Sequence, residues 1–165
     1  GGKLEVALIG LENSGKTTLL NQLTMGEPLP TAPTIGLNVK QFKKGGVKMK
    51  VWDIGGQVQY RSEWGTYTKG CDCVIFLVDA GNPDCLPISK KELHMLLEDK
   101  ELNGIPLLII GNKIDIKPHL TESEIITGLN LDYIGTNVWA VMMVSALKGT
   151  NVSDVVDWLV KRSKQ

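Results

Sequence analysis

The sequence predicts an α/β protein built on a mostly parallel sheet of six strands, with one antiparallel hairpin at its edge and helices on both faces. Short apolar runs alternate with helical patterns along the chain, which is typical of strand–helix–strand units. Two glycines, Gly45 and Gly46, join the second and third runs and favour a tight hairpin there. The expected strands cover residues 4–9, 37–43, 47–52, 73–78, 106–110 and 138–144.

The expected helices carry start or stop signals. The first has an apolar pattern over residues 18–25 and is closed by Gly26. A second covers about 89–102, and a third begins at Thr121, where Glu124 completes a capping box. The last helix has an apolar stripe with i, i+3, i+4, i+7 and i+8 spacing, which predicts a core-facing side: Val152, Val155, Val156, Leu159 and Val160.

Composition restricts the class of protein. A length of 165 residues with 42% hydrophobic and 22% charged residues predicts one globular domain over residues 1–165. The net charge of +0 offers no electrostatic basis for nucleic-acid binding. The three cysteines, Cys71, Cys73 and Cys85, form no secreted disulfide pattern, and Cys71 and Cys73 run into an apolar strand where small buried thiols are common. Without a signal peptide or an apolar run of about 18 residues, a cytoplasmic location is expected.

The segment from Gly10 to Thr17 fits the phosphate-loop pattern G-x-x-x-x-G-K-[ST], between an apolar run and a helical pattern. Its glycines allow backbone N–H groups to surround a polyphosphate, and the following helix adds the positive end of its dipole. Lys16 places a charge between the β- and γ-phosphates, and the Thr17 hydroxyl is suited to ligate Mg²⁺. The expected nucleotide contacts are Glu12, Asn13, Ser14, Gly15, Lys16, Thr17 and Thr18. The motif predicts a nucleoside triphosphate site and leaves ATP and GTP open.

A second polar segment, Asp53 to Gln57, follows the third expected strand. Ligands of open α/β sheets bind at the carboxyl ends of strands, so Asp53 is expected beside the phosphate loop and near the metal. Gly56 can offer its backbone N–H to a γ-phosphate, and Gln57 has both a donor and an acceptor with which to orient an attacking water. Gln57 is therefore the expected catalytic residue. Taken alone, the segment also fits an aspartate that caps a turn.

A third segment, residues 112–115, indicates the base. Asp115 can accept hydrogen bonds from guanine N1–H and N2–H₂ together, which adenine does not offer, and sites of this kind discriminate by roughly 10⁴ to 10⁵. Lys113 is expected to pack its stem over the base, and Asn112 to tie this loop to the phosphate loop. A backbone N–H for guanine O6 is expected from one of three residues: Ser145, Ala146 and Leu147.

Together these motifs resemble those of the Ras-like small GTPases, and the resemblance covers essentially the whole chain. It rests on Gly10 to Thr17, Thr34, Asp53 to Gln57, Asn112 to Asp115 and Ser145-Ala146. Within that superfamily the chain is similar to the Arf and Arf-like branch, through residues 33–36 and 52–57 and through Arg61, Trp64 and Tyr67. Residues 92–94 and 104–106 look most like the lysosome-associated Arf-like subgroup.

The resemblance implies a P-loop GTPase fold that binds GTP and GDP with Mg²⁺ and slowly hydrolyses GTP. It implies that Thr34 ligates Mg²⁺ together with Thr17 and meets the γ-phosphate only in the GTP state. It also implies a monomer that works with a guanine nucleotide exchange factor, a GTPase-activating protein and effectors that bind the GTP state. The expected effector patch is Leu37, Trp52, Trp64 and Tyr67.

The resemblance further implies vesicle or membrane traffic on the cytosolic face of an endomembrane, with a lysosome or late endosome expected. The resemblance implies that Arf relatives reach membranes through an N-terminal helix, and we expect none within this sequence, which opens Gly1-Gly2-Lys3 directly before the first strand. Two residues depart from the family pattern: Leu37, where relatives often carry Phe, and Glu12 in the phosphate loop. Glu12 leaves open a nucleotide-bound scaffold that does not hydrolyse GTP, and a phosphate-loop kinase is the other alternative.

Overall fold

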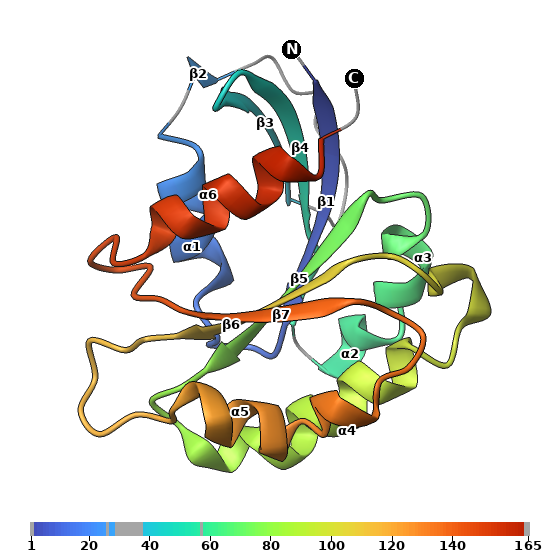
Figure 1. The fold of residues 1–165 in the computed structure, drawn as a ribbon, viewed down its shortest axis with the longest axis vertical. Coiled ribbons are helices and arrows are strands. Elements are labelled where there is room, and N and C mark those ends of the chain that lie inside the picture. Colours follow the sequence, from blue (N-terminus) through green and yellow to red (C-terminus); the bar gives the residue numbers. More distant parts are fainter. Residues whose placement is uncertain (1, 26, 29–37, 57, 164–165) are drawn as a thin grey trace.

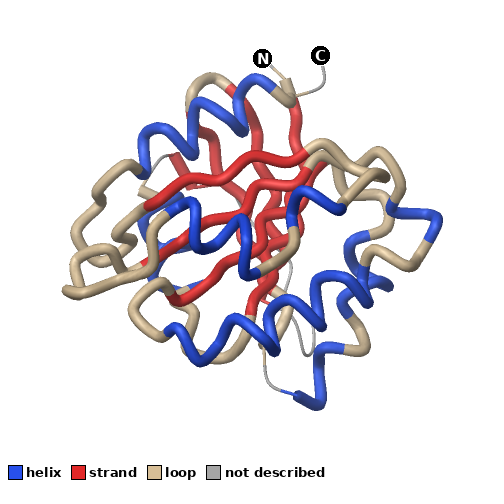
Figure 2. The backbone as a smooth tube through the Cα atoms, turned by 60° about the horizontal axis from the view of Figure 1, so that its bottom comes forward, coloured by secondary structure: helices blue, strands red, loops and turns tan. Residues whose placement is uncertain are grey.

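The computed structural model describes residues 2–25, 27–28, 38–56 and 58–163, and it contains one twisted sheet with helices on both faces (Figures 1 and 2). The strand order is β2-β3-β4-β1-β5-β6-β7. The strands are β1 (Lys3–Gly10), β2 (Glu27–Pro28), β3 (Asn38–Lys44), β4 (Val47–Asp53), β5 (Cys73–Asp79), β6 (Leu107–Asn112) and β7 (Trp139–Met143). All pairs are parallel except β2 with β3 and β3 with β4. The predicted mostly parallel sheet with an antiparallel edge pair is confirmed.

The helices are α1 (Lys16–Leu23), α2 (Val58–Arg61), α3 (Trp64–Thr68), α4 (Leu86–Leu96), α5 (Glu122–Gly128) and α6 (Val152–Lys161). Three 3₁₀ turns cover Pro83–Cys85, Lys100–Leu102 and Leu131–Tyr133. Helices α1 and α6 cover one face of the sheet, while α3, α4 and α5 lie on the other (Figure 1). Within the described residues, no helix is both long and apolar enough to cross a membrane.

The edge hairpin forms because Gly45 and Gly46 both adopt positive φ values, 59° and 77°, which residues with a side chain rarely take. These two glycines place Lys44 opposite Val47 and set the register of the whole β3–β4 pair. The described sheet has one more strand than predicted, because the two residues of β2 pair with β3. A strand of two residues is too short to produce a period in the sequence.

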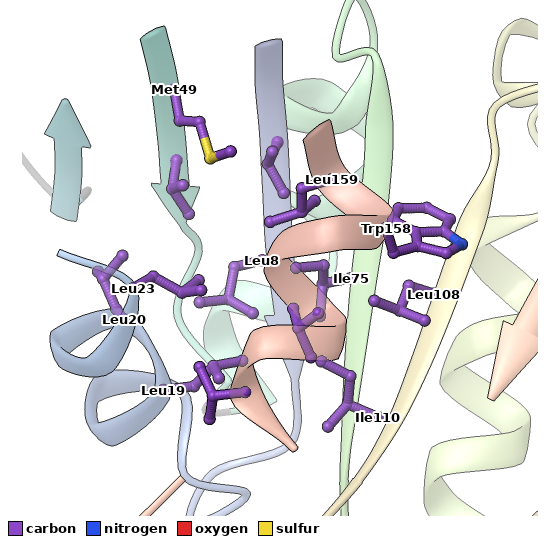
Figure 3. Close-up of a cluster of buried hydrophobic side chains, with 14 of the residues drawn as sticks. Leu8, Leu19, Leu20, Leu23, Met49, Ile75, Leu108, Ile110, Trp158 and Leu159 are labelled. Atoms are coloured by element: carbon purple, nitrogen blue, oxygen red, sulfur yellow. The ribbon is translucent and has the colours of Figure 1, made fainter. Parts of the chain in front are cut away.

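The core consists of two apolar clusters, one on each face of the sheet. Alternate residues of β1 divide between them, so that Leu8 belongs to the α1–α6 side and Ile9 to the other. Figure 3 shows the first cluster, where Leu19 of α1 and Leu159 of α6 lie against Leu8 and Ile75 of the sheet. The predicted stripe of α6 is confirmed, since three of its members are buried and two are partly buried: Val152, Val155, Leu159, Val156 and Val160.

The helix boundaries differ from the predicted ones in three places. Helix α1 ends at Leu23 rather than near residue 25, and Gly26 lies outside the described residues. Helix α4 covers Leu86–Leu96, and a separate 3₁₀ turn follows, so the single helix expected over 89–102 is wrong. Helices α2 and α3 were not predicted, because four or five residues are too few to show a helical period.

The capping box of α5 is confirmed. Glu124 N donates to Thr121 Oγ1 over 3.1 Å, and Thr121 N donates to Glu124 Oε1 over 3.0 Å. These bonds satisfy two backbone donors that the first turn of a helix otherwise leaves unpaired.

The parallel strands of the sheet bring the functional residues together, because their carboxyl ends lie at the same edge. The strands β1, β4, β5 and β6 end at one edge, with Gly10, Asp53, Asp79 and Asn112 as their last residues. The chain order reverses beside β1, since β3 and β4 lie on one side of it and β5 to β7 on the other. A crevice at such a reversal is where open α/β sheets bind their ligands.

Candidate functional site

A cavity of about 690 Å³ opens at this edge of the sheet. It is lined by Glu12, Asn13, Ser14, Gly15, Lys16, Thr17, Thr18, Asn38, Asp53, Gly55, Gly56 and Tyr60. All the phosphate-loop residues predicted to bind nucleotide are among them, as are Asp53 and Gly56. The two remaining predictions for this end of the site, Thr34 and Gln57, lie outside the described residues.

The phosphate loop keeps its shape through positive φ values at Gly10, Asn13 and Gly15, which are 156°, 68° and 98°. A Cβ on Gly10 would approach Leu77 O to 2.6 Å, and one on Gly15 would collide with the side-chain amide of Asn112. Side chains are therefore excluded where the loop folds against the ends of β5 and β6, and helix α1 begins directly after the loop. The first residues of this helix, Lys16, Thr17 and Thr18, line the cavity, and the N-terminus of a helix is suited to bind phosphate.

Lys16 and Asp53 face each other in this cavity, with Nζ and Oδ1 4.0 Å apart. Burial lowers the pKa of Lys16, while Asp53 and Glu12 oppose that change. Burial likewise raises the pKa of Asp53, against the effects of Lys16 and the Asn38 side chain. In both groups desolvation is the larger effect, so each charged form lacks part of the stabilisation it would have in water. A polyphosphate with a bound cation would supply the missing partners.

The site fits Mg²⁺ through the chemistry of its donors. The described residues contain no group of three or more His, Cys, Asp and Glu side chains that would hold a metal by themselves. Mg²⁺ in nucleotide sites does not need one, because it keeps several waters and binds substrate phosphates with one or two protein oxygens. Thr17, which is exposed, and Asp53 both line the cavity. The hydroxyl of Thr17 and the carboxylate of Asp53 provide such oxygens.

Gly56 packs directly on the phosphate loop. Its carbonyl oxygen accepts from Glu12 N over 3.2 Å and from Arg61 Nε over 3.1 Å. A Cβ on Gly56 would lie 2.7 Å from Glu12 N, so no other residue fits at this contact. Arg61 is also paired with Glu92 of α4, with Nη1 and Oε1 3.7 Å apart. Arg61 is thus held by Gly56 and α4 and does not line the cavity.

The segment 112–115 is joined to the phosphate loop and to residues 145–148 by side-chain hydrogen bonds. The buried Asn112 donates from Nδ2 to Ser14 O over 2.9 Å, which is the connection that the sequence predicts. Its Oδ1 accepts from Ala146 N, also over 2.9 Å. In this structure the N–H of Ala146 is engaged by Asn112 and that of Ser145 by Thr150 O. Which of the residues 145–147 donates to guanine O6 stays a prediction. Leu147, the exposed neighbour of Ala146, lies on the same loop.

Asp115 is oriented by Ser145, whose Oγ donates to Asp115 Oδ1 over 2.7 Å. Ser145 Oγ in turn accepts from Lys148 N over 3.1 Å. Ser145 therefore holds Oδ1 of this carboxylate in place. Among the described residues, none donates a hydrogen bond to Oδ2. Such a carboxylate is suited to accept hydrogen bonds from the edge of a base.

Lys113 makes contacts that the sequence did not reveal. Its Nζ donates to Asn13 O over 2.6 Å and to Asp79 Oδ2 over 2.8 Å. Asp79, the last residue of β5, is not among the predicted site residues. The one sequence signal for it is its position, an aspartate at the end of an apolar strand. Its importance depends on the pairing of β5 with β6, which no local pattern encodes.

The expected effector patch needs one correction. Trp64 is only 1% exposed, and its Nε1 donates to Gly55 O over 3.0 Å, so in this structure it is a core residue. Trp52 and Tyr67 do lie together, half-buried and stacked with 6.5 Å between their ring centroids. Leu37 lies outside the described residues. The burial of Trp64 depends on how its helix packs against Gly55 and Phe76, which no local sequence pattern shows.

Fold and site together define a nucleotide-binding protein in which a phosphate loop, the Asp53 carboxylate and the polar loop 112–115 lie at one edge of a mostly parallel sheet. The chain belongs to the ADP-ribosylation factor family, which it matches over residues 2–163. It is therefore a small GTPase that binds GTP and GDP as a nucleotide-dependent switch and hydrolyses GTP. Family membership decides against the phosphate-loop kinase.

The chain is similar to two curated proteins of Arabidopsis thaliana. It is 42% identical to ADP-ribosylation factor-like protein 8b and 39% identical to ADP-ribosylation factor-like protein 8c, each over 98% of this chain and 89% of the relative. Among solved structures it resembles the Arl6 BBS3 small GTPase from Trypanosoma brucei, which was determined with the nucleotide analogue GppNp. That likeness has a TM-score of 0.85 and 34% identity and covers 96% of both chains.

Proposed function

We propose that residues 1–165 form a single G domain that binds GTP and GDP with Mg²⁺ and hydrolyses GTP slowly. The observation that carries this proposal is that Asn112 joins the phosphate loop to the base-recognition loop through two buried hydrogen bonds. One side chain thereby holds the two halves of a nucleotide site in a single arrangement. The cavity on the phosphate side already contains Lys16 and Asp53.

In this proposal each residue has a defined role. Lys16 and the N–H groups of residues 12–18 bind the phosphates and neutralise charge that develops in the transition state. Thr17 and Thr34 would hold Mg²⁺, which would neutralise charge on the phosphates when bound. Asp115 accepts from guanine N1–H and N2–H₂, and Gly56 offers its N–H to the γ-phosphate.

Gln57 orients the attacking water in line with the leaving phosphate. Arg61 does not supply a second positive charge, since Gly56 and Glu92 hold its guanidinium. Hydrolysis therefore depends on a GTPase-activating partner, and an arginine from such partners accelerates other small GTPases by about 10³ to 10⁵. A guanine nucleotide exchange factor serves the opposite step, and the protein acts as a monomer without nucleic acid.

The proposed output is recruitment of effectors in the GTP state, through Trp52, Tyr67 and Leu37. Trp52 and Tyr67 support this because their stacked rings are partly accessible beside β4, whose last residue is Asp53. The proposed setting is membrane or vesicle traffic on the cytosolic face of a lysosome or late endosome. Similarity to ADP-ribosylation factor-like protein 8b supports that setting, at 42% identity.

A single-turnover assay tests the proposal. Protein loaded with radiolabelled GTP in EDTA and then given Mg²⁺ should release phosphate slowly, and ATP should not compete for loading. Wild-type protein that loads ATP as readily as GTP would refute the base site. Retention of unhydrolysed GTP over many hours in wild type, with release restored in Glu12→Gly, would instead support the scaffold alternative.

A further inference from the structure

We propose that Asp79 is a positioning residue that sets the lifetime of the bound nucleotide by holding the ammonium group of Lys113 across the phosphate loop. The inference rests on the proposed nucleotide site, because Lys113 belongs to its base-recognition loop. Asp79 itself does not line the phosphate cavity. Its effect on the nucleotide therefore passes through Lys113.

Asp79 stands at the end of β5, directly opposite Asn112 at the end of β6. Its two carboxylate oxygens have different partners. Oδ1 accepts from Gly81 N over 2.9 Å and shapes the turn after β5, while Oδ2 lies 2.8 Å from Lys113 Nζ. The side chains of Asp79 and Lys113 are 16% and 30% exposed, so the pair is largely shielded from solvent.

Lys113 connects two loops that are distant in the sequence. The same Nζ that pairs with Asp79 donates to Asn13 O in the phosphate loop over 2.6 Å. Both Lys113 and Asn13 have left-handed backbone, with φ values of 71° and 68°. Asparagine adopts this conformation more readily than most residues, but for Lys113 it is unfavourable and persists only when surrounding contacts hold it. The ammonium bridge is such a contact, and it acts on both loops at once.

The charge of Asp79 is what keeps the ammonium group in this position. A lysine side chain is long, flexible and strongly hydrated, so a neutral carbonyl alone competes poorly with water for it. A hydrogen bond between two charged groups is about twice as strong as one between neutral groups. Within the described residues, Asp79 is the only carboxylate within 4.0 Å of Lys113 Nζ. Without the charge of Asp79, the Lys113 side chain is no longer held in one position between the two loops.

The test is the rate at which fluorescent mant-GDP leaves the Mg²⁺-bound protein when excess GDP is added. Asp79→Asn keeps the shape of the side chain and an oxygen that can accept from Gly81 N. It removes the charge and places an amide N–H₂ donor opposite the ammonium group, so the hydrogen bond to Lys113 is lost. We expect release to become about tenfold faster, because one charge-assisted hydrogen bond is removed. The matched control is Asp99→Asn, which removes one of the two carboxylate charges paired with Lys69, at 3.2 Å, and lies outside the cavity lining. The control should release mant-GDP at the wild-type rate.

A double-mutant cycle separates positioning of Lys113 from a general effect on the β5 turn. In a Lys113→Ala background, adding Asp79→Asn should change the release rate by less than about twofold, because the two changes remove one shared interaction. Unchanged release in the single variant would overturn the inference, as would an undiminished tenfold effect in the Lys113→Ala background. Failure of the wild-type protein to retain mant-GDP would instead overturn the proposed function itself.

Discussion

Replacing Trp64 tests whether this ring is part of the core or part of a binding surface. The side chain is 1% exposed and lies edge-on to Phe76, with 6.0 Å between ring centroids and 82° between ring planes. Its Nε1 also donates to Gly55 O over 3.0 Å, immediately before the Gly56 contact with the phosphate loop. Trp64→Ala should therefore lower the free energy of unfolding, in addition to any effect on partners.

The structure sets the expected size of the effect. A buried indole removes about 200 Å² from water, worth about 5 kcal/mol at roughly 25 cal/mol per Å². The unfolded chain already hides part of that area, which brings the loss to about 4 kcal/mol, within the range of about 3 to 5 for such truncations. Trp64→Phe keeps most of the apolar volume but leaves the Gly55 carbonyl without its donor, so it should cost about 1 to 2 kcal/mol.

Urea unfolding followed by circular dichroism measures both losses, with GDP and Mg²⁺ held at fixed concentrations because bound ligand adds to apparent stability. The control is Tyr133→Ala, whose ring is 84% exposed and whose loss should change the free energy of unfolding by less than about 0.5 kcal/mol. If Trp64→Ala unfolds within about 1 kcal/mol of wild type, while partner binding is lost, Trp64 is a surface anchor and the buried assignment is refuted.

Three further outcomes are expected. Asp115→Asn should keep the bond from Ser145 Oγ but weaken GTP and favour xanthine nucleotides, which competition binding measures; unchanged GTP preference would remove Asp115 from base recognition. Gln57→Leu should bind GTP normally yet lower partner-stimulated hydrolysis by about 10² or more, in a single-turnover assay. Burial raises the pKa of the Cys71 thiol to about 12, and those of Cys73 and Cys85 are also raised. Thiolate increases only as pH rises toward the pKa, so at pH 8 on the order of 10⁻⁴ of Cys71 is ionised; rapid native-state reaction of Cys71 or Cys73 with a disulfide reagent would contradict this.

Local patterns predicted much of the fold, because each depends on residues close together in the chain. The strand runs appear within one or two residues of their expected bounds, and the Gly45-Gly46 turn and the Thr121 capping box form as predicted. The phosphate-loop residues also line one cavity, since a continuous motif specifies its own backbone shape. Elements as short as β2 and α2 contain too few residues to show a repeating apolar pattern in the sequence, so they could not be predicted in this way.

By itself, the sequence determined the α/β class, the order of the elements and the phosphate loop, and it predicted which residues recognise the base. Only the tertiary structure decided that Trp64 is buried, that Ala146 N is engaged by Asn112, and that Asp79 holds Lys113. Each of these depends on contacts across the sheet or between loops: Asp79 and Lys113 are 34 positions apart, and Asn13 and Lys113 are 100 apart. A side chain's environment is set by which strands become neighbours, and that choice is made by packing of the whole core rather than by any local pattern.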